Sequence, residues 1–125
     1  MKLLLFLTKP YSVSILEPIE IYCKSFSEVE VAWYKAGSAK HINIDSLVLN
    51  NSEEVIDFNP DAIIVPGNVV PDFWPGLKVQ IFHGLCEEKK GHYDITGFFD
   101  IYCTPGPQIT EKFQELALKH KNFIV

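Results

Sequence analysis

The stretch KVQIFHGLC at residues 78–86 carries the most information about the fold of this chain. Its apolar half predicts a strand that runs directly into His83 and Gly84. A second apolar stretch, within FDIYCTPGP at residues 99–107, predicts a strand that ends at Thr104. Ligands of an open α/β sheet bind beyond the carboxyl ends of its strands. A titratable histidine beside a glycine at such a strand end therefore marks a candidate site.

Outward from this stretch, strand patterns alternate with helix patterns along the whole chain. Strands are predicted at residues 2–8, 28–34, 41–45, 61–65, 78–82, 100–103 and 123–125. Helices are predicted at residues 12–26, from Ser52 to just before Pro60, and at 107–120. Ser52 is the expected N-cap of the second helix. Pro18 falls inside the first helical pattern, so it either kinks that helix or marks a later start.

This alternation predicts an α/β protein with a mainly parallel sheet and right-handed crossovers. The expected architecture is a Rossmann-like three-layer α/β/α sandwich. We find no internal repeat or interdomain linker, and residues 1–125 are expected to form a single domain. A hydrophobic fraction of 47% supplies enough apolar side chains for a sizeable core.

Composition narrows the classes of partner. The net charge is −5, whereas nucleic-acid binding needs a basic face, so no nucleic-acid partner is expected. No run approaches the roughly 20 apolar residues of a membrane span, and the apolar residues 1–8 lack a signal-peptide cleavage site. Three cysteines without regular spacing predict reduced thiols in a cytoplasmic protein. Cys23 and Cys103 are expected to pack as small hydrophobic side chains, and neither a metal nor a cofactor is expected.

Two further segments near His83 could contact a ligand. Lys89 and Lys90 are suited to a phosphate or carboxylate group, although such a pair is also typical of a solvated loop. Thr104 and Gly106 stand between a predicted strand and a predicted helix, where free backbone N–H groups can bind an anion. Structural capping of that helix is an equally good interpretation of this turn.

Two other chemistries are disfavoured by the sequence. The connection at residues 8–14 lacks the G-x-G-x-x-G pattern that lets a pyrophosphate approach the backbone, so a dinucleotide site is not expected there. Cys86 is followed by Glu87 and Glu88, whose negative charge opposes formation of a thiolate nucleophile. His83 is the candidate general base, and a histidine that hydrogen-bonds a neighbouring carbonyl group in a loop is an equally good interpretation of it.

From residue 78 onward the chain resembles the CDP-glycerol glycerophosphotransferases of teichoic-acid synthesis, which belong to the broader GT-B glycosyltransferase group. The family pattern "hydrophobic–Gln–x–x–His–Gly" is matched by VQIFHG at residues 79–84, and "Tyr/Phe–Asp–x–x–x–Thr" by FDIYCT at residues 99–104. The family usually has Thr-Pro and then Lys soon after His-Gly, whereas residues 85–88 here read LCEE. Residues 1–77 match only in architecture.

The resemblance implies an acceptor-side domain in which His83 deprotonates an acceptor hydroxyl. Lys89 and Lys90 would contact phosphates of a phosphorylated polyol or glycan acceptor. Gly84, Thr104 and Gly106 would line the same substrate site.

The resemblance also implies a partner domain. The nucleotide of the donor would be held by a C-terminal nucleotide-binding domain, without which this chain is expected to be inactive. A full-length protein of this kind would lie in the cytoplasm, peripheral to the inner face of the membrane. An exposed domain interface would allow a homodimer.

Two alternatives remain open at this point. DAIIVPG at residues 61–67 resembles the turn of DJ-1-like and class I amidotransferase enzymes, but Phe82 stands where their nucleophilic cysteine would be. A non-catalytic binding module is the other alternative, with Trp33, Phe73 and Trp74 as aromatic anchors.

Overall fold

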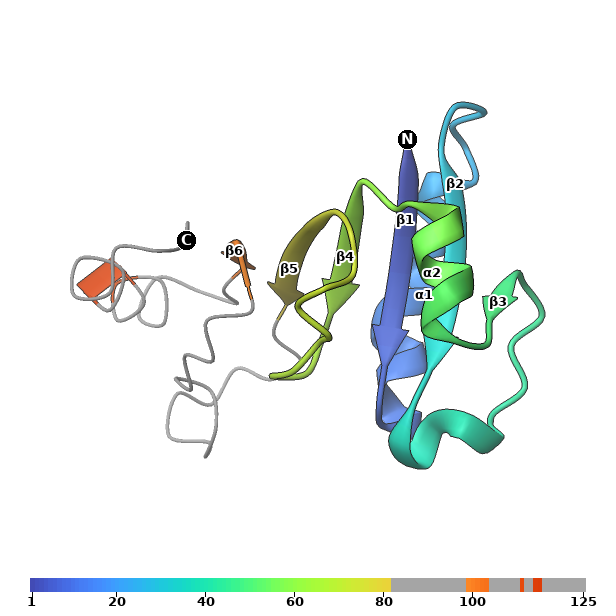
Figure 1. The fold of residues 1–125 in the computed structure, drawn as a ribbon, viewed down its shortest axis with the longest axis horizontal. Coiled ribbons are helices and arrows are strands. Elements are labelled where there is room, and N and C mark those ends of the chain that lie inside the picture. The colour runs from blue at the N-terminus through green and yellow to red at the C-terminus, as the bar shows by residue number, and fades with distance from the viewer. Residues whose placement is uncertain (82–98, 104–110, 112–113, 116–125) are drawn as a thin grey trace.

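The computed structural model describes residues 1–81, 99–103, 111 and 114–115, and these residues form an α/β fold (Figure 1). They contain one sheet of six strands in the order β3-β2-β1-β4-β5-β6, with every neighbouring pair parallel. The strands are β1 (Lys2–Leu7), β2 (Glu30–Lys35), β3 (Val48–Leu49), β4 (Ala62–Val65), β5 (Leu77–Ile81) and β6 (Ile101–Cys103). The prediction of an α/β protein with a parallel sheet is therefore confirmed.

β1 is the central strand, and both of its faces are buried. Leu4 and Leu5 point to opposite sides of the sheet, and each is 0% exposed. A strand that is apolar on both faces is typical of a parallel sheet covered on both sides. β1 pairs with β2 along six residues and with β4 along three. The continuous apolar run LLLFL is thus explained by the strand's position between two neighbours, with side chains packed on both of its faces.

Helix α1 (Val13–Cys23) packs on one face of the sheet, after a 3-10 turn η1 at Pro10–Ser12. Its Leu16 belongs to the cluster that contains Leu5 and Leu7 of β1. Trp33 of β2 joins the same cluster, and its indole N–H donates to the Glu20 carboxylate at 2.8 Å. This bond gives the buried Glu20 a partner.

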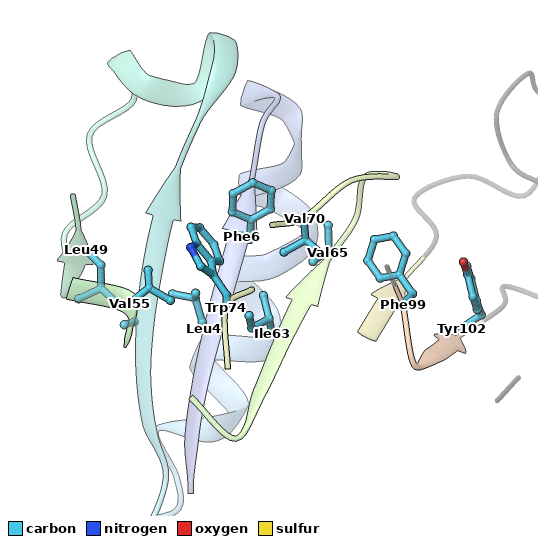
Figure 2. Packing of buried hydrophobic residues seen from close by; sticks show 11 residues of the cluster. Leu4, Phe6, Leu49, Val55, Ile63, Val65, Val70, Trp74, Phe99 and Tyr102 are labelled. Atoms are coloured by element: carbon cyan, nitrogen blue, oxygen red, sulfur yellow. The ribbon is translucent and has the colours of Figure 1, made fainter. Parts of the chain in front are cut away.

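The opposite face is covered by helix α2 (Ser52–Phe58) and by the connection between β4 and β5. Trp74 of that connection meets the rings of Phe6 and Tyr34 at centroid distances of 5.4 and 4.7 Å. Its indole N–H donates to the Ser52 hydroxyl at 3.0 Å. Figure 2 shows Trp74 beside Phe6 in the middle of this core. The loop is therefore fixed to the sheet by a buried aromatic side chain.

Two details of the predicted elements were wrong. The third strand lies at Val48–Leu49 rather than at residues 41–45, because the chain after β2 forms the 3-10 helix η2 (Gly37–His41). The N-cap of α2 is Asn51 rather than Ser52, since the Asn51 side chain accepts a hydrogen bond from the Glu54 N–H at 2.9 Å.

The remaining helix and strand predictions are confirmed only in part. The first helix begins at Val13 and keeps Pro18 in its interior. Residues 111, 114 and 115 are helical, whereas the rest of the helix predicted at 107–120 and the strand predicted at 123–125 lie outside the described residues. No helix within the described part of the chain combines the length and the apolar character needed to cross a membrane.

Candidate functional site

The order of the strands singles out one position at the carboxyl edge of the sheet. From β1 the chain continues to β2 on one side, and after β3 it returns to β4 on the other side of β1. Ligands of such sheets bind where the strand order reverses, outside the carboxyl ends of the two diverging strands. Here these ends are followed by Thr8 and by the turn at residues 66–68. This edge is the lower one in Figure 1.

The turn after β2 closes over the end of β1. Gly37 has a φ of 55°, and a Cβ at this position would lie 3.0 Å from the Thr8 carbonyl oxygen. The Ser38 hydroxyl donates to the same carbonyl at 3.2 Å. Glycine is needed at position 37 because both the left-handed backbone and the close approach disfavour a side chain. Two hydroxyl-bearing residues, Thr8 and Ser38, are thereby brought together at the edge of the sheet.

Gln80 anchors the turn after β4. Its side chain is 2% exposed, and its Nε2 donates to the Gly67 carbonyl and to Asn68 Oδ1, each at 2.7 Å. Two acceptors on one side fix the orientation of the amide. The amide oxygen Oε1 is buried and has no hydrogen-bond partner. A buried acceptor without a partner costs about 1–3 kcal/mol, so the two hydrogen bonds donated by Nε2 hold the amide in this orientation at a cost.

The candidate site residues predicted from the sequence all lie outside the described residues. They are His83, Gly84, Lys89, Lys90, Thr104 and Gly106. The structure does describe the strand ends that precede them. Ile81, the last residue of β5, is the register partner of Cys103, the last residue of β6. The segments that contain His83 and Thr104 thus begin at neighbouring positions on the carboxyl edge.

Sequence reasoning missed the role of Gln80 and the residues at the end of β1. Gln80 was noticed only as part of a motif, because its partners Gly67 and Asn68 lie more than ten residues away in the chain. Thr8 carries no motif at all. The only available signal was its position directly after a buried apolar strand.

Two cysteine predictions have different outcomes. Cys23 is buried in the structure, as expected, whereas Cys103 is exposed at the end of β6, so its prediction was wrong. Partial desolvation nevertheless raises the pKa of the Cys103 thiol. The thiol therefore stays protonated at neutral pH and is a poor nucleophile there. Cys86 lies outside the described residues.

The structure also tests the suggestion of aromatic anchors. Of the three proposed aromatic anchors, Trp33 and Trp74 are core residues, at 1% and 2% exposure, and only Phe73 is exposed. This burial removes most of the support for an aromatic docking surface. Within the described residues, no group of three histidine, cysteine or acidic side chains is arranged to hold a metal ion.

Comparison of the chain with protein-family models, with curated proteins and with solved structures finds no match.

Proposed function

We propose that this chain is the acceptor-side domain of a transferase that uses a nucleotide-activated donor, in the manner of a CDP-glycerol glycerophosphotransferase. Its architecture would be the Rossmann-like three-layer sandwich of a GT-B N-terminal domain. The observation that best supports the proposal is the pairing of Ile81 with Cys103. Because of this pairing, the segments that contain His83 and Thr104 follow neighbouring strands, at the edge where ligands of such sheets bind.

In the proposed reaction His83 is the general base. Its imidazole, with an ordinary pKa of about 6.5, can accept the proton of an acceptor hydroxyl near neutral pH. The acceptor oxygen then bonds to the phosphorus of the glycerol phosphate, and the bond from that phosphorus to the nucleotide phosphate breaks. The nucleotide leaves with the electron pair of that bond. Proton, bond formed and bond broken are thus all accounted for.

The remaining predicted residues have supporting roles in this proposal. Lys89 and Lys90 would neutralise phosphate groups of a phosphorylated polyol or glycan acceptor. Gly84 and Gly106 would let the acceptor approach the backbone, with the Thr104 hydroxyl as a hydrogen-bonding partner. A C-terminal domain would hold the nucleotide, and closure of the two domains would exclude water. The protein would work in the cytoplasm at the inner membrane face, and a free domain interface would support a homodimer.

The decisive experiment is kinetic and uses the protein as its gene encodes it. Release of CMP from CDP-glycerol is measured with a glycerol-phosphate acceptor for the wild type, His83→Ala and His41→Ala. Loss of a general base lowers kcat by about 10²–10⁴-fold. His41, an exposed residue of η2, supplies the matched control. Wild-type activity in His83→Ala, or no CMP release from the wild type, would refute the proposal.

A further inference from the structure

A second feature of the carboxyl edge lies away from the His83 segment. A cavity of about 210 Å³ opens at the ends of β2 and β3. It is lined by Lys35, Lys40, Val48, Leu49 and Asn50. Tyr34 and Leu49 are register partners, so Lys35 and Asn50 follow at adjacent positions. The cavity is therefore built into the sheet edge rather than formed by one loop.

The two lysines give this cavity a positive charge. The half-buried Lys35 ammonium donates to the Ile42 carbonyl at 2.6 Å, which holds it in place and leaves two of its three protons for a ligand. Lys40 is exposed on η2. Within the part of the chain that the structure describes, neither lysine is paired with a carboxylate.

The Glu54 carboxylate lies next to the cavity lining and is already engaged. Glu54 accepts a hydrogen bond from the backbone N–H of Asn50. The cavity lining itself contains no acidic residue. Two lysines without a carboxylate partner, in a chain of net charge −5, indicate a site for an anion.

The size of the cavity restricts the ligand. Pockets that enclose drug-sized molecules have volumes of about 300–1,000 Å³, so a space of about 210 Å³ is too small for a nucleotide. In dinucleotide-binding sheets, a basic side chain near the ribose accommodates a phosphate group. The position of Lys35 at the end of β2 is suited to that task.

We propose that the cavity between β2 and β3 binds the phosphate group of a small phosphate ester through Lys35 and Lys40. Val48 and Leu49 would contact the few carbon atoms attached to the phosphate. This inference goes beyond the proposed transferase function and does not depend on His83. Either proposal can fail while the other stands.

The test is a titration of the ¹⁵N-labelled chain, followed by amide chemical shifts, with inorganic phosphate and separately with glycerol 3-phosphate. Sodium chloride is adjusted to hold the ionic strength constant, since screening alone weakens charge interactions. We expect saturable shifts centred on residues 35–50. Lys40→Gln removes a charge-assisted contact and should raise Kd about tenfold. Lys40 is exposed, so this variant should fold.

Lys24→Gln is the matched control, because it makes the same charge change at an exposed lysine directly after α1, where Lys24 pairs with Glu20 at 3.7 Å and lies outside the cavity. Its Kd should equal that of the wild type within about twofold, in keeping with weak surface charge effects. Equal weakening in Lys24→Gln and Lys40→Gln would refute a specific site. Shifts that do not saturate, or that map away from residues 35–50, would also refute it.

A lipid headgroup is the other possible source of the phosphate. Sedimentation with phosphatidylcholine vesicles containing phosphatidylglycerol separates the two sources. Binding of free glycerol 3-phosphate, without Lys40-dependent sedimentation, assigns the site to a free ester. Lys40-dependent sedimentation without binding of the free ligands would overturn the assignment to a small ester and show that the phosphate belongs to a lipid. Absence of both refutes the proposal.

Discussion

Gly37 and Gly67 both lie at the carboxyl edge of the sheet, but only Gly37 needs to be glycine. A Cβ at Gly37 would lie 3.0 Å from the Thr8 carbonyl oxygen on a backbone with φ of 55°, whereas a Cβ at Gly67 would lie 3.8 Å from the Thr8 hydroxyl. We expect Gly37→Ala to lower the free energy of unfolding by about 1–2 kcal/mol. Gly67→Ala should change it by less than about 0.5 kcal/mol. Urea unfolding measures both, and equal losses would contradict this account.

Gln80 gives a second prediction, which concerns a buried amide. Gln80→Leu loses two donated hydrogen bonds, which is unfavourable, but it also removes the buried Oε1 that has no partner, which is favourable. The two effects partly cancel, so we expect the free energy of unfolding to fall by about 1 kcal/mol. Gln80→Glu keeps the shape but places a carboxylate against the Gly67 carbonyl and Asn68 Oδ1. An uncompensated buried charge costs about 3–5 kcal/mol. Chemical denaturation at pH 7 should therefore rank Glu as the worse replacement. The reverse order would indicate that the amide is not buried as described.

Tyr102 makes the stability depend on alkaline pH. Burial raises the pKa of its phenol above the ordinary value of about 10. Below pH 10 both states keep the proton, and this contribution to stability is complete. As the pH rises further, the unfolded state ionises first, and stability is lost until the folded pKa is passed. In Tyr102→Phe, the free energy of unfolding should fall less steeply above pH 10, by up to about 1.4 kcal/mol per pH unit. An unchanged profile above pH 10 would exclude Tyr102 as its cause.

The start of helix α2 shows how one side chain defines an element. Asn51 Oδ1 accepts from the Glu54 N–H, and the Glu54 carboxylate accepts from the Asn50 N–H. Asn51→Ala removes the cap and should cost about 1 kcal/mol. Asn51→Asp keeps the acceptor and should stay close to the wild type. Thermal unfolding compares them, and an Asp variant as unstable as the Ala variant would show that the cap does not matter.

The same helix explains where sequence interpretation succeeds and where it stops. The pattern of acidic residues after Ser52 located α2, but Ser52 itself accepts from the Trp74 indole, a partner far away in the chain. Asn51, one residue earlier, was free to serve as the cap. Asparagine and serine are both good N-cap residues, but only Ser52 was expected to serve as the cap. Only the packing of Trp74 on the sheet decides between them.

Contacts between residues far apart in the chain also decide the position of the third strand and the contacts around the candidate site. HINID at residues 41–45 alternates as a strand should, yet η2 uses the first of these residues, and Trp33 and Tyr34 pair with Val48 and Leu49 instead. Long buried runs such as residues 2–7 were predictable, because their periodicity is set by burial on both faces. The contacts of Gln80 and the Lys35–Lys40 cavity were not, because they depend on turns between distant strands.

At the scale of the whole molecule, the position of β1 links stability to the candidate site. It lies between β2 and β4, and its end places Thr8 at the point of the carboxyl edge where the strand order reverses. Its side chains enter the cores on both faces of the sheet. Among the six described strands, β1 is buried along five of its six residues, so this part of the carboxyl edge rests on a buried strand. A binding edge fixed in this way is suited to holding a ligand in one geometry.

Native-state hydrogen exchange should reveal a difference in local stability between the central and edge strands of the described sheet. The amides of Leu4 and Leu5 lie in the central strand, so we expect them to exchange only through global unfolding, with the full free energy of unfolding. Those of Val48 and Leu49 lie in a two-residue edge strand paired only with β2. They should exchange through local opening, at a lower free energy that hardly changes with low concentrations of denaturant. If Leu49 were as protected as Leu4, the β2–β3 edge would belong to the rigid core. The cavity that we assign to a phosphate would then be formed before its ligand arrives.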